Sequence, residues 1–198
     1  LGTRLGHAFR DRALVEQAEL IRAREHDPKL DGVLWQGKQY EGLVCNVVEQ
    51  LWASGTALFS DDGRVLPDLD RAAAALTFMR ALIDRGVSPG WVTAGDEELT
   101  RRAFGDGHAV FLRSWPYAMD LFEQPESPIG GRVGIAAVPG HVGGAAGVGT
   151  TGGFHLAVNR RTRHAEAAVA LVRFLGSERG QRALTAPGVA LYPTRTAL

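Results

Sequence analysis

Apolar residues in this 198-residue chain alternate between helical spacing and short strand-like runs. The clearest helix is expected over residues 68–85, where apolar side chains recur every three or four positions between the N-cap candidate Asp68 and Gly86. The same criteria predict helices at 9–25, 41–53, 96–104, 116–122, 163–175 and 177–185. Short strands are expected at 32–36, 57–60, 108–112, 132–138 and 154–158. This alternation predicts an α/β fold, with a sheet flanked by helices.

Charge and composition exclude several classes of function. The 22 basic side chains balance the 22 acidic ones, so we expect no nucleic-acid partner. Cys45 is the single cysteine, which excludes an intrachain disulfide and a cysteine-based zinc cage. The six histidines have no metal-ligand spacing, so no metal and no cofactor are expected. No apolar run reaches the roughly 18 residues of a membrane helix, and no secretion signal is visible at residues 1–9.

The least regular stretch, residues 139–153, is rich in glycine. It contains a formal G-x-G-x-x-G match at 147–152, but a dinucleotide site needs a strand before this motif and a helix after it. The glycines are better explained by loop flexibility, or by a polar ligand that approaches the backbone at Gly152 and Gly153. We find no internal repeat, and no linker that would split the chain into two domains.

Motifs for nucleophilic catalysis are missing from the sequence. There is no G-x-S-x-G elbow, and Cys45 lies on the apolar face of a predicted helix, where a buried, inert thiol is expected. A glycosidase would need two carboxylates that face each other. The sequence leaves open whether any of the available pairs converge, and we assign no catalytic residue; the pairs are Glu41 and Glu49, Glu97 and Glu98, and Asp120 and Glu123.

Trp115 is the first candidate for ligand binding. It follows the expected strand 108–112 and begins a helix, because Pro116 suits a first helical position. Side chains at the carboxyl end of a strand face the crevice in which open α/β sheets bind ligands. The flat apolar ring of Trp115 can stack on a sugar; the alternative is a tryptophan of the core.

Three segments, in order, resemble the extracellular solute-binding proteins of ABC sugar importers (family 1). They run from Trp35 to Asn46, from Glu97 to Ala118, and from Gly152 to Gly180. The most similar group is the trehalose/maltose-binding branch of the maltose-binding-protein class. The resemblance implies a periplasmic-binding-protein-like (type II) fold, in which residues 13–198 form the C-terminal lobe of a two-lobed receptor. Residues 1–12 do not match, and the N-terminal lobe and the closing helices would be absent.

The resemblance also implies ligand contacts. Trp115 matches a sugar-stacking tryptophan, and Glu98, less well Glu97, matches an acidic position that accepts hydrogen bonds from sugar hydroxyls. Gly152 and Gly153 match a point where the backbone approaches the sugar. The remaining matches, which are weaker, are Tyr117, Arg195, Tyr40 and Asn46.

The implied function is non-enzymatic capture of a carbohydrate, such as the disaccharides trehalose or maltose. Two lobes would close about a hinge around the ligand and deliver it to the permease of an ABC transporter. The full-length protein would be extracytoplasmic, in the periplasm or anchored at the cell surface as a lipoprotein. Two alternatives stay open: a carbohydrate-active enzyme domain that uses paired carboxylates, and a structural fragment with no binding of its own.

Overall fold

The computed structural model describes residues 27, 29–65, 68–140, 147–186 and 191–194. Although the sequence contains no obvious linker, the chain separates into two compact units. Unit 1 comprises Leu1–Ser114 and Pro125–Thr150, and unit 2 comprises Trp115–Gln124 and Thr151–Leu198. The chain therefore leaves unit 1 at two places, after Ser114 and after Thr150.

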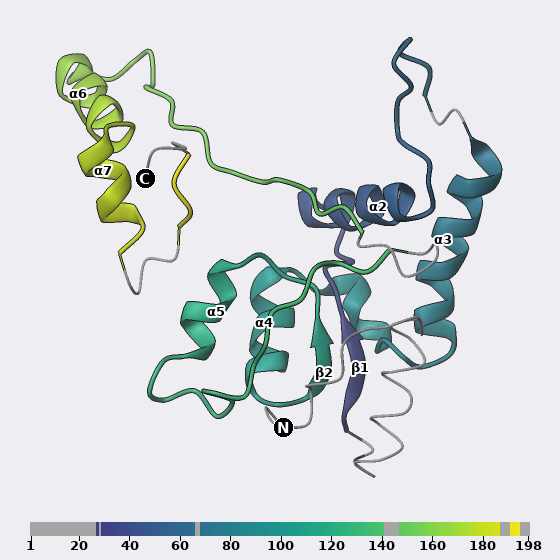
Figure 1. Cartoon of the computed structure of the whole chain (residues 1–198). Coiled ribbons are helices and arrows are strands. Elements are labelled where there is room, and N and C mark those ends of the chain that lie inside the picture. The colour runs from purple at the N-terminus through teal and green to yellow at the C-terminus, as the bar shows by residue number, and fades with distance from the viewer. Residues whose placement is uncertain (1–26, 28, 66–67, 141–146, 187–190, 195–198) are drawn as a thin grey trace. The chain divides into compact units, whose positions relative to one another are not determined.

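Unit 1 is built on two parallel strands, β1 (Asp31–Leu34) and β2 (Ala109–Leu112), with Val33 opposite Phe111 (Figure 1). The other edge of β1 is also occupied, because the amides of Gly32 and Val33 both donate to the Val87 carbonyl, at 2.9 and 3.1 Å. The elements between the strands are α2 (Glu41–Ala53), α3 (Leu69–Asp84), the 3-10 helix η1 (Gly90–Ala94) and α4 (Glu97–Gly105).

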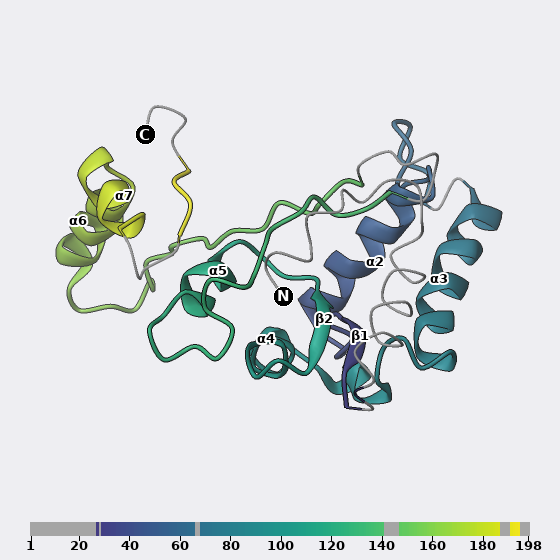
Figure 2. The same cartoon turned by 60° about the horizontal axis from the view of Figure 1, so that its bottom comes forward.

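The helices lie on both sides of the strands. Figures 1 and 2 place α3 and α4 on opposite sides of the β1–β2 pair, and α4 packs along β2 while α2 packs against α3. The main core is formed by β1, α3 and the segment that follows α3, and its buried members are Val33, Leu34, Trp35, Met79, Leu82, Val87 and Val92. This layering confirms the predicted α/β fold, with a smaller sheet than the sequence indicates.

Local sequence signals set the helix ends. The Asp68 carboxylate accepts a hydrogen bond from the Arg71 amide at 3.0 Å, as an N-cap should. Gly86 follows α3 with φ of +67°, the left-handed conformation that glycine adopts without strain. Asp96 caps α4 in the same way, through the Leu99 amide at 3.1 Å. The predicted helices at 41–53, 68–85 and 96–104 are confirmed.

Unit 2 contains the helices α5 (Tyr117–Phe122), α6 (Ala165–Leu175) and α7 (Glu178–Leu184). The Ser177 side chain caps α7 by accepting from the Gly180 amide at 3.2 Å. Gly180 is required for packing, since a Cβ at this position would collide with the Phe174 carbonyl oxygen. The helices predicted at 116–122, 163–175 and 177–185 are confirmed.

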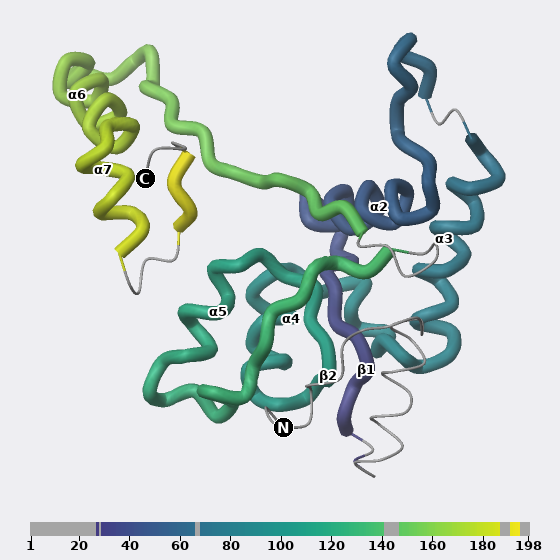
Figure 3. The backbone as a smooth tube through the Cα atoms, in the orientation of Figure 1, coloured from purple at the N-terminus to yellow at the C-terminus, as the bar shows by residue number. Residues whose placement is uncertain are grey.

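Three of the predicted strands are wrong. Residues 132–138 and 154–158 form no strand, and 57–60 contributes a single bridge, between Phe59 and Val65. Figure 3 traces the path of the backbone through these segments. A strand needs a ladder of hydrogen bonds to a neighbour. Among the described residues, 132–138 has one bond of this kind, from the Gly147 amide to the Val138 carbonyl at 2.6 Å, and no ladder forms. The predicted helix at 9–25 lies outside the described residues. In the part of the chain that the structure describes, no helix has the length and apolar character to cross a membrane.

Candidate functional site

A buried polar network follows the carboxyl ends of β1 and β2. The Gln36 side chain is fully buried, and its amide nitrogen donates to Thr100 Oγ1 at 3.0 Å and to the Arg113 carbonyl at 2.9 Å. Asn46 on α2 donates to Gln36 Oε1 at 3.2 Å and to the Gly42 carbonyl at 2.8 Å. Asn46 is only 5% exposed, so the structure places this predicted ligand contact in the interior, where it joins α2 to the end of β1.

The centre of this network is the carboxylate of Glu49 on α2. Its side chain is 3% exposed and forms a two-pronged ion pair with Arg113, at 2.9 Å from Nε and 2.5 Å from Nη2. Thr150 adds two further donors, its amide at 2.9 Å and its hydroxyl at 2.7 Å. Burial alone would raise the pKa of the Glu49 carboxyl, but the hydrogen bonds from Arg113 and Thr150 outweigh it and hold this pKa below its usual value.

Tyr40 and Glu97, two predicted site residues, are in direct contact. The Tyr40 hydroxyl donates to Glu97 Oε2 at 2.5 Å, which joins the start of α2 to the start of α4. Burial and the hydrogen bond to Glu97 raise the pKa of the Tyr40 hydroxyl, so it remains protonated and can donate. Lys38 reinforces the same junction through an ion pair with Asp96 at 2.9 Å.

Glu98 lies apart from this contact. Its side chain is 56% exposed and pairs with Arg101 on its own helix at 2.7 Å. The hydrogen bond from Arg101 lowers the pKa of the Glu98 carboxyl, so Glu98 is ionised at neutral pH. An exposed carboxylate of this kind retains acceptor capacity for a ligand hydroxyl.

Trp115 and Gly152, two further predicted site residues, lie together in unit 2. A Cβ at Gly152 would stand 3.3 Å from the Trp115 indole nitrogen, so the absence of a side chain permits the close approach. At Gly153 a Cβ would meet no atom within 4 Å, and both glycines are exposed. Trp115 is half-buried.

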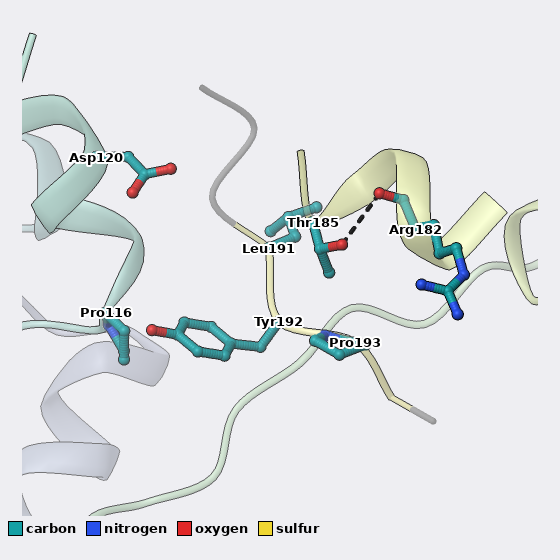
Figure 4. A pocket seen from close by; sticks show the side chains of 7 residues that line it. All are labelled: Pro116, Asp120, Arg182, Thr185, Leu191, Tyr192 and Pro193. Carbon is teal, nitrogen blue, oxygen red and sulfur yellow. Dashed lines mark hydrogen bonds between the residues drawn. The ribbon is translucent and has the colours of Figure 1, made fainter. Parts of the chain in front are cut away.

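The remaining predicted residue of unit 2, Tyr117, is half-buried in the first turn of α5, two positions after Trp115. Arg195 lies outside the described residues. A pocket of about 380 Å³ in unit 2 adds side chains that the sequence analysis did not select. Figure 4 shows Tyr192 extending towards Pro116 there; the lining residues are Pro116, Asp120, Arg182, Thr185, Leu191, Tyr192 and Pro193.

Among the described residues no group of three or more His, Cys, Asp or Glu side chains could hold a metal ion. Of the carboxylates considered for catalysis, Glu49, Glu97 and Glu98 each accept hydrogen bonds from neighbouring side chains. The Cys45 thiol is buried as predicted, and burial raises its pKa.

The sequence predicts Glu49 only as one member of a possible carboxylate pair, and it does not indicate Arg113 or Gln36 as partners. A signal was available, because Glu49 lies three and four positions after Asn46 and Cys45, on the predicted apolar face. A carboxylate on a buried face requires a cationic partner.

Comparison with known proteins gives a consistent result. Residues 14–182 match the family described as bacterial extracellular solute-binding protein. A probable ABC transporter-binding protein of Deinococcus radiodurans is 36% identical over 174 residues, which cover 85% of this chain and 40% of that protein.

Among solved structures, maltose-bound T. maritima MalE3 is similar with a TM-score of 0.79 and 36% identity, over 98% of this chain and 50% of that one. An ABC transporter solute-binding protein of Agrobacterium radiobacter in complex with ribitol has a TM-score of 0.73 at 19% identity, over 91% of this chain and 45% of that one. The chain thus spans two fifths of the first relative and half of the MalE3 chain. The likeness confirms the expected type II periplasmic-binding-protein-like fold, and the chain belongs to the family of bacterial extracellular solute-binding proteins.

Proposed function

We propose that residues 13–198 form the C-terminal lobe of a two-lobed receptor that binds a sugar and delivers it to the permease of an ABC transporter. The receptor works outside the cytoplasmic membrane, and its ligand is a disaccharide of the maltose or trehalose type. Family membership and the 36% identity to a maltose-bound relative support this ligand class. The function is capture and release, without chemical conversion of the sugar.

The single observation that carries the proposal is the contact between Trp115 and Gly152. A sugar ring has apolar faces and a polar rim. The indole face of Trp115 supplies an apolar platform, while the exposed backbone at Gly152 and Gly153 supplies amide and carbonyl groups for the hydroxyls. In unit 1, Glu98 is a separate candidate contact, because its exposed carboxylate can accept a hydrogen bond from a hydroxyl.

Calorimetric titration with maltose and trehalose tests the proposal, in the 198-residue chain and in the full-length gene product. Trp115→Ala in the full-length product should weaken binding by more than about 1 kcal/mol, the scale of an aromatic anchor. Trp52→Ala is the matched control, because Trp52 is 37% exposed on α2 and belongs to none of the predicted contacts.

A full-length product that binds no saccharide would contradict the proposal. If Trp115→Ala and Trp52→Ala bind equally well, Trp115 is a packing residue and the platform lies elsewhere. If the full-length product binds and the 198-residue chain does not, the chain alone is a structural fragment that needs the rest of the protein.

A further inference from the structure

Two candidate sugar contacts occupy matching positions relative to the Glu49 network. Trp115 comes two residues after Arg113, and Gly152 comes two residues after Thr150. Arg113 and Thr150 are the two side chains that bind the buried Glu49 carboxylate. They also stand at the two places where the chain leaves unit 1, after Ser114 and after Thr150.

We infer that Glu49 is a positioning residue of the sugar site, which fixes Trp115 and Gly152 relative to each other by anchoring both chain segments to one buried carboxylate. The inference rests on the proposed function. Two residues span at most about 7 Å, so the positions of Arg113 and Thr150 restrict where Trp115 and Gly152 can lie. The two anchored segments are far apart in sequence, and Glu49 is the acceptor that they share.

The geometry of the network makes the anchor rigid. The Arg113 guanidinium uses Nε and Nη2 on the two oxygens of Glu49, a fork that fixes orientation as well as distance. The Arg113 Nη2 also donates to Thr150 Oγ1 at 3.1 Å, so the two segments are bonded to each other as well as to Glu49. The position of Arg113 is further set by its amide, which donates to the Leu34 carbonyl of β1 at 2.9 Å.

Fluorine NMR of the full-length gene product labelled with 5-fluorotryptophan tests the inference without any sugar. This chain has four tryptophans, and Trp115→Phe identifies the resonance of Trp115. In Glu49→Gln we expect the Trp115 resonance to shift or broaden while that of Trp35 keeps its position. Thr150→Val removes the Thr150 hydroxyl from the network but keeps the Thr150 amide bond and the buried ion pair, so it should produce a smaller change at the same resonance.

Ser88→Ala is the matched control. Ser88 is as buried as Glu49, and it accepts from the Trp35 indole at 3.1 Å and donates to the Val33 carbonyl at 2.7 Å. Ser88→Ala should move the Trp35 resonance and leave the Trp115 resonance unchanged. The inference is wrong if Glu49→Gln and Thr150→Val both leave the Trp115 resonance in place, or if Ser88→Ala perturbs it equally.

Maltose titration of the same variants separates this inference from the proposed function. Glu49→Gln should weaken binding at least tenfold and Ser88→Ala less than twofold. A wild-type protein that binds no saccharide refutes the proposed function, and the fluorine spectra still decide whether Glu49 positions Trp115. A wild-type protein that binds sugar, together with a Glu49→Gln variant of equal affinity, refutes the positioning role alone.

Discussion

The two adjacent glutamates at the start of α4 are chemically identical and differ in their surroundings. Glu97 accepts the Tyr40 hydroxyl at 2.5 Å and so joins two helices. Glu98 points to the exposed side and pairs with Arg101, one turn along the same helix. A hydrogen bond to a charged group within the protein contributes more to stability than an exposed ion pair.

We therefore expect the two charge-neutralising substitutions to act on different properties. Glu98→Gln should leave the free energy of unfolding nearly unchanged and weaken sugar binding about tenfold, the effect of one charge-assisted hydrogen bond. Glu97→Gln should lower the free energy of unfolding by about 1–2 kcal/mol. Urea unfolding and calorimetric titration of both variants provide the measurements. If Glu97→Gln reduces the affinity and Glu98→Gln does not, the ligand contact belongs to Glu97.

For individual residues, the sequence predicts which residue types are used better than it predicts their surroundings. Tyr40 and Asn46 were selected by resemblance, and their surroundings depend on partners that are distant in sequence. Tyr40 meets a side chain 57 positions away, and the Asn46 amide is used within the core. No local pattern specifies such partners, because they follow from the packing of α2 against the ends of two strands.

At the scale of elements, helices were predictable and strands only partly so. A helix closes its hydrogen bonds within itself, and the caps Asp68, Asp96 and Ser177 mark its start locally. An apolar alternation such as that at 154–158 indicates only that a segment is able to pair. The segments predicted at 32–36 and 108–112 pair with each other as β1 and β2, and β1 is buried from Gly32 to Leu34 while β2 is half-buried.

The ion pair that joins α2 to the end of β2 makes stability depend on pH. The pKa of Glu49 is lower in the folded protein than its unfolded value of about 4.3, so the folded state favours the charged form. This contribution is fully present above the unfolded pKa, and it is lost as the pH falls through the folded pKa.

The pH dependence that Glu49 contributes is measured by urea unfolding of the wild type and of Glu49→Gln from pH 6 down to about pH 3. In the variant, residue 49 cannot ionise. The stability advantage of the wild type, about 3 kcal/mol for a broken buried pair, should shrink as the pH falls below about 4.3. The exposed acids titrate in both proteins, so their contributions cancel when the two free energies of unfolding are subtracted. Glu166→Gln, at an exposed position of α6, should show only a small difference from wild type. A Glu49→Gln difference that stays constant down to pH 3 would contradict the pKa shift.

On the scale of the whole molecule, the buried apolar residues are concentrated in unit 1. Both apolar clusters of the described residues lie there, one along β1 and one between α2 and α3. In unit 2, α6 has no buried residue along its whole length. An isolated helix of 11 residues is only marginally stable in water, because tertiary packing supplies most helical stability.

Hydrogen exchange measured by mass spectrometry on the 198-residue chain should show that α6 is less stable than the buried helices of unit 1. Amides of α3, which buries Ala72, Ala75, Met79 and Leu82, should exchange at least about a hundredfold more slowly than those of α6. Equal protection of the two helices would mean that α6 is stabilised by contacts outside the described structure, such as a second copy of the chain. If self-association protects α6, its amides should exchange faster when the protein is diluted a hundredfold. Protection by contacts within one chain should not change on dilution.

The family and the fold class were predictable from three ordered motifs, and the match over residues 14–182 confirms this reading. The division into two units was not predictable. It follows from the path of the chain, which leaves unit 1 after Ser114, re-enters it at Pro125 and leaves it again after Thr150.

The bond between Thr150 and Glu49 joins residues 101 positions apart, and this sets an order of events during synthesis. The ribosome releases α2 long before Thr150 emerges, so the Glu49 carboxylate waits without its complete set of donors. Contacts of such high sequence separation form late and slow the folding of a domain. Unit 1 therefore completes the set of donors around Glu49 only after its second segment, Pro125–Thr150, has been made.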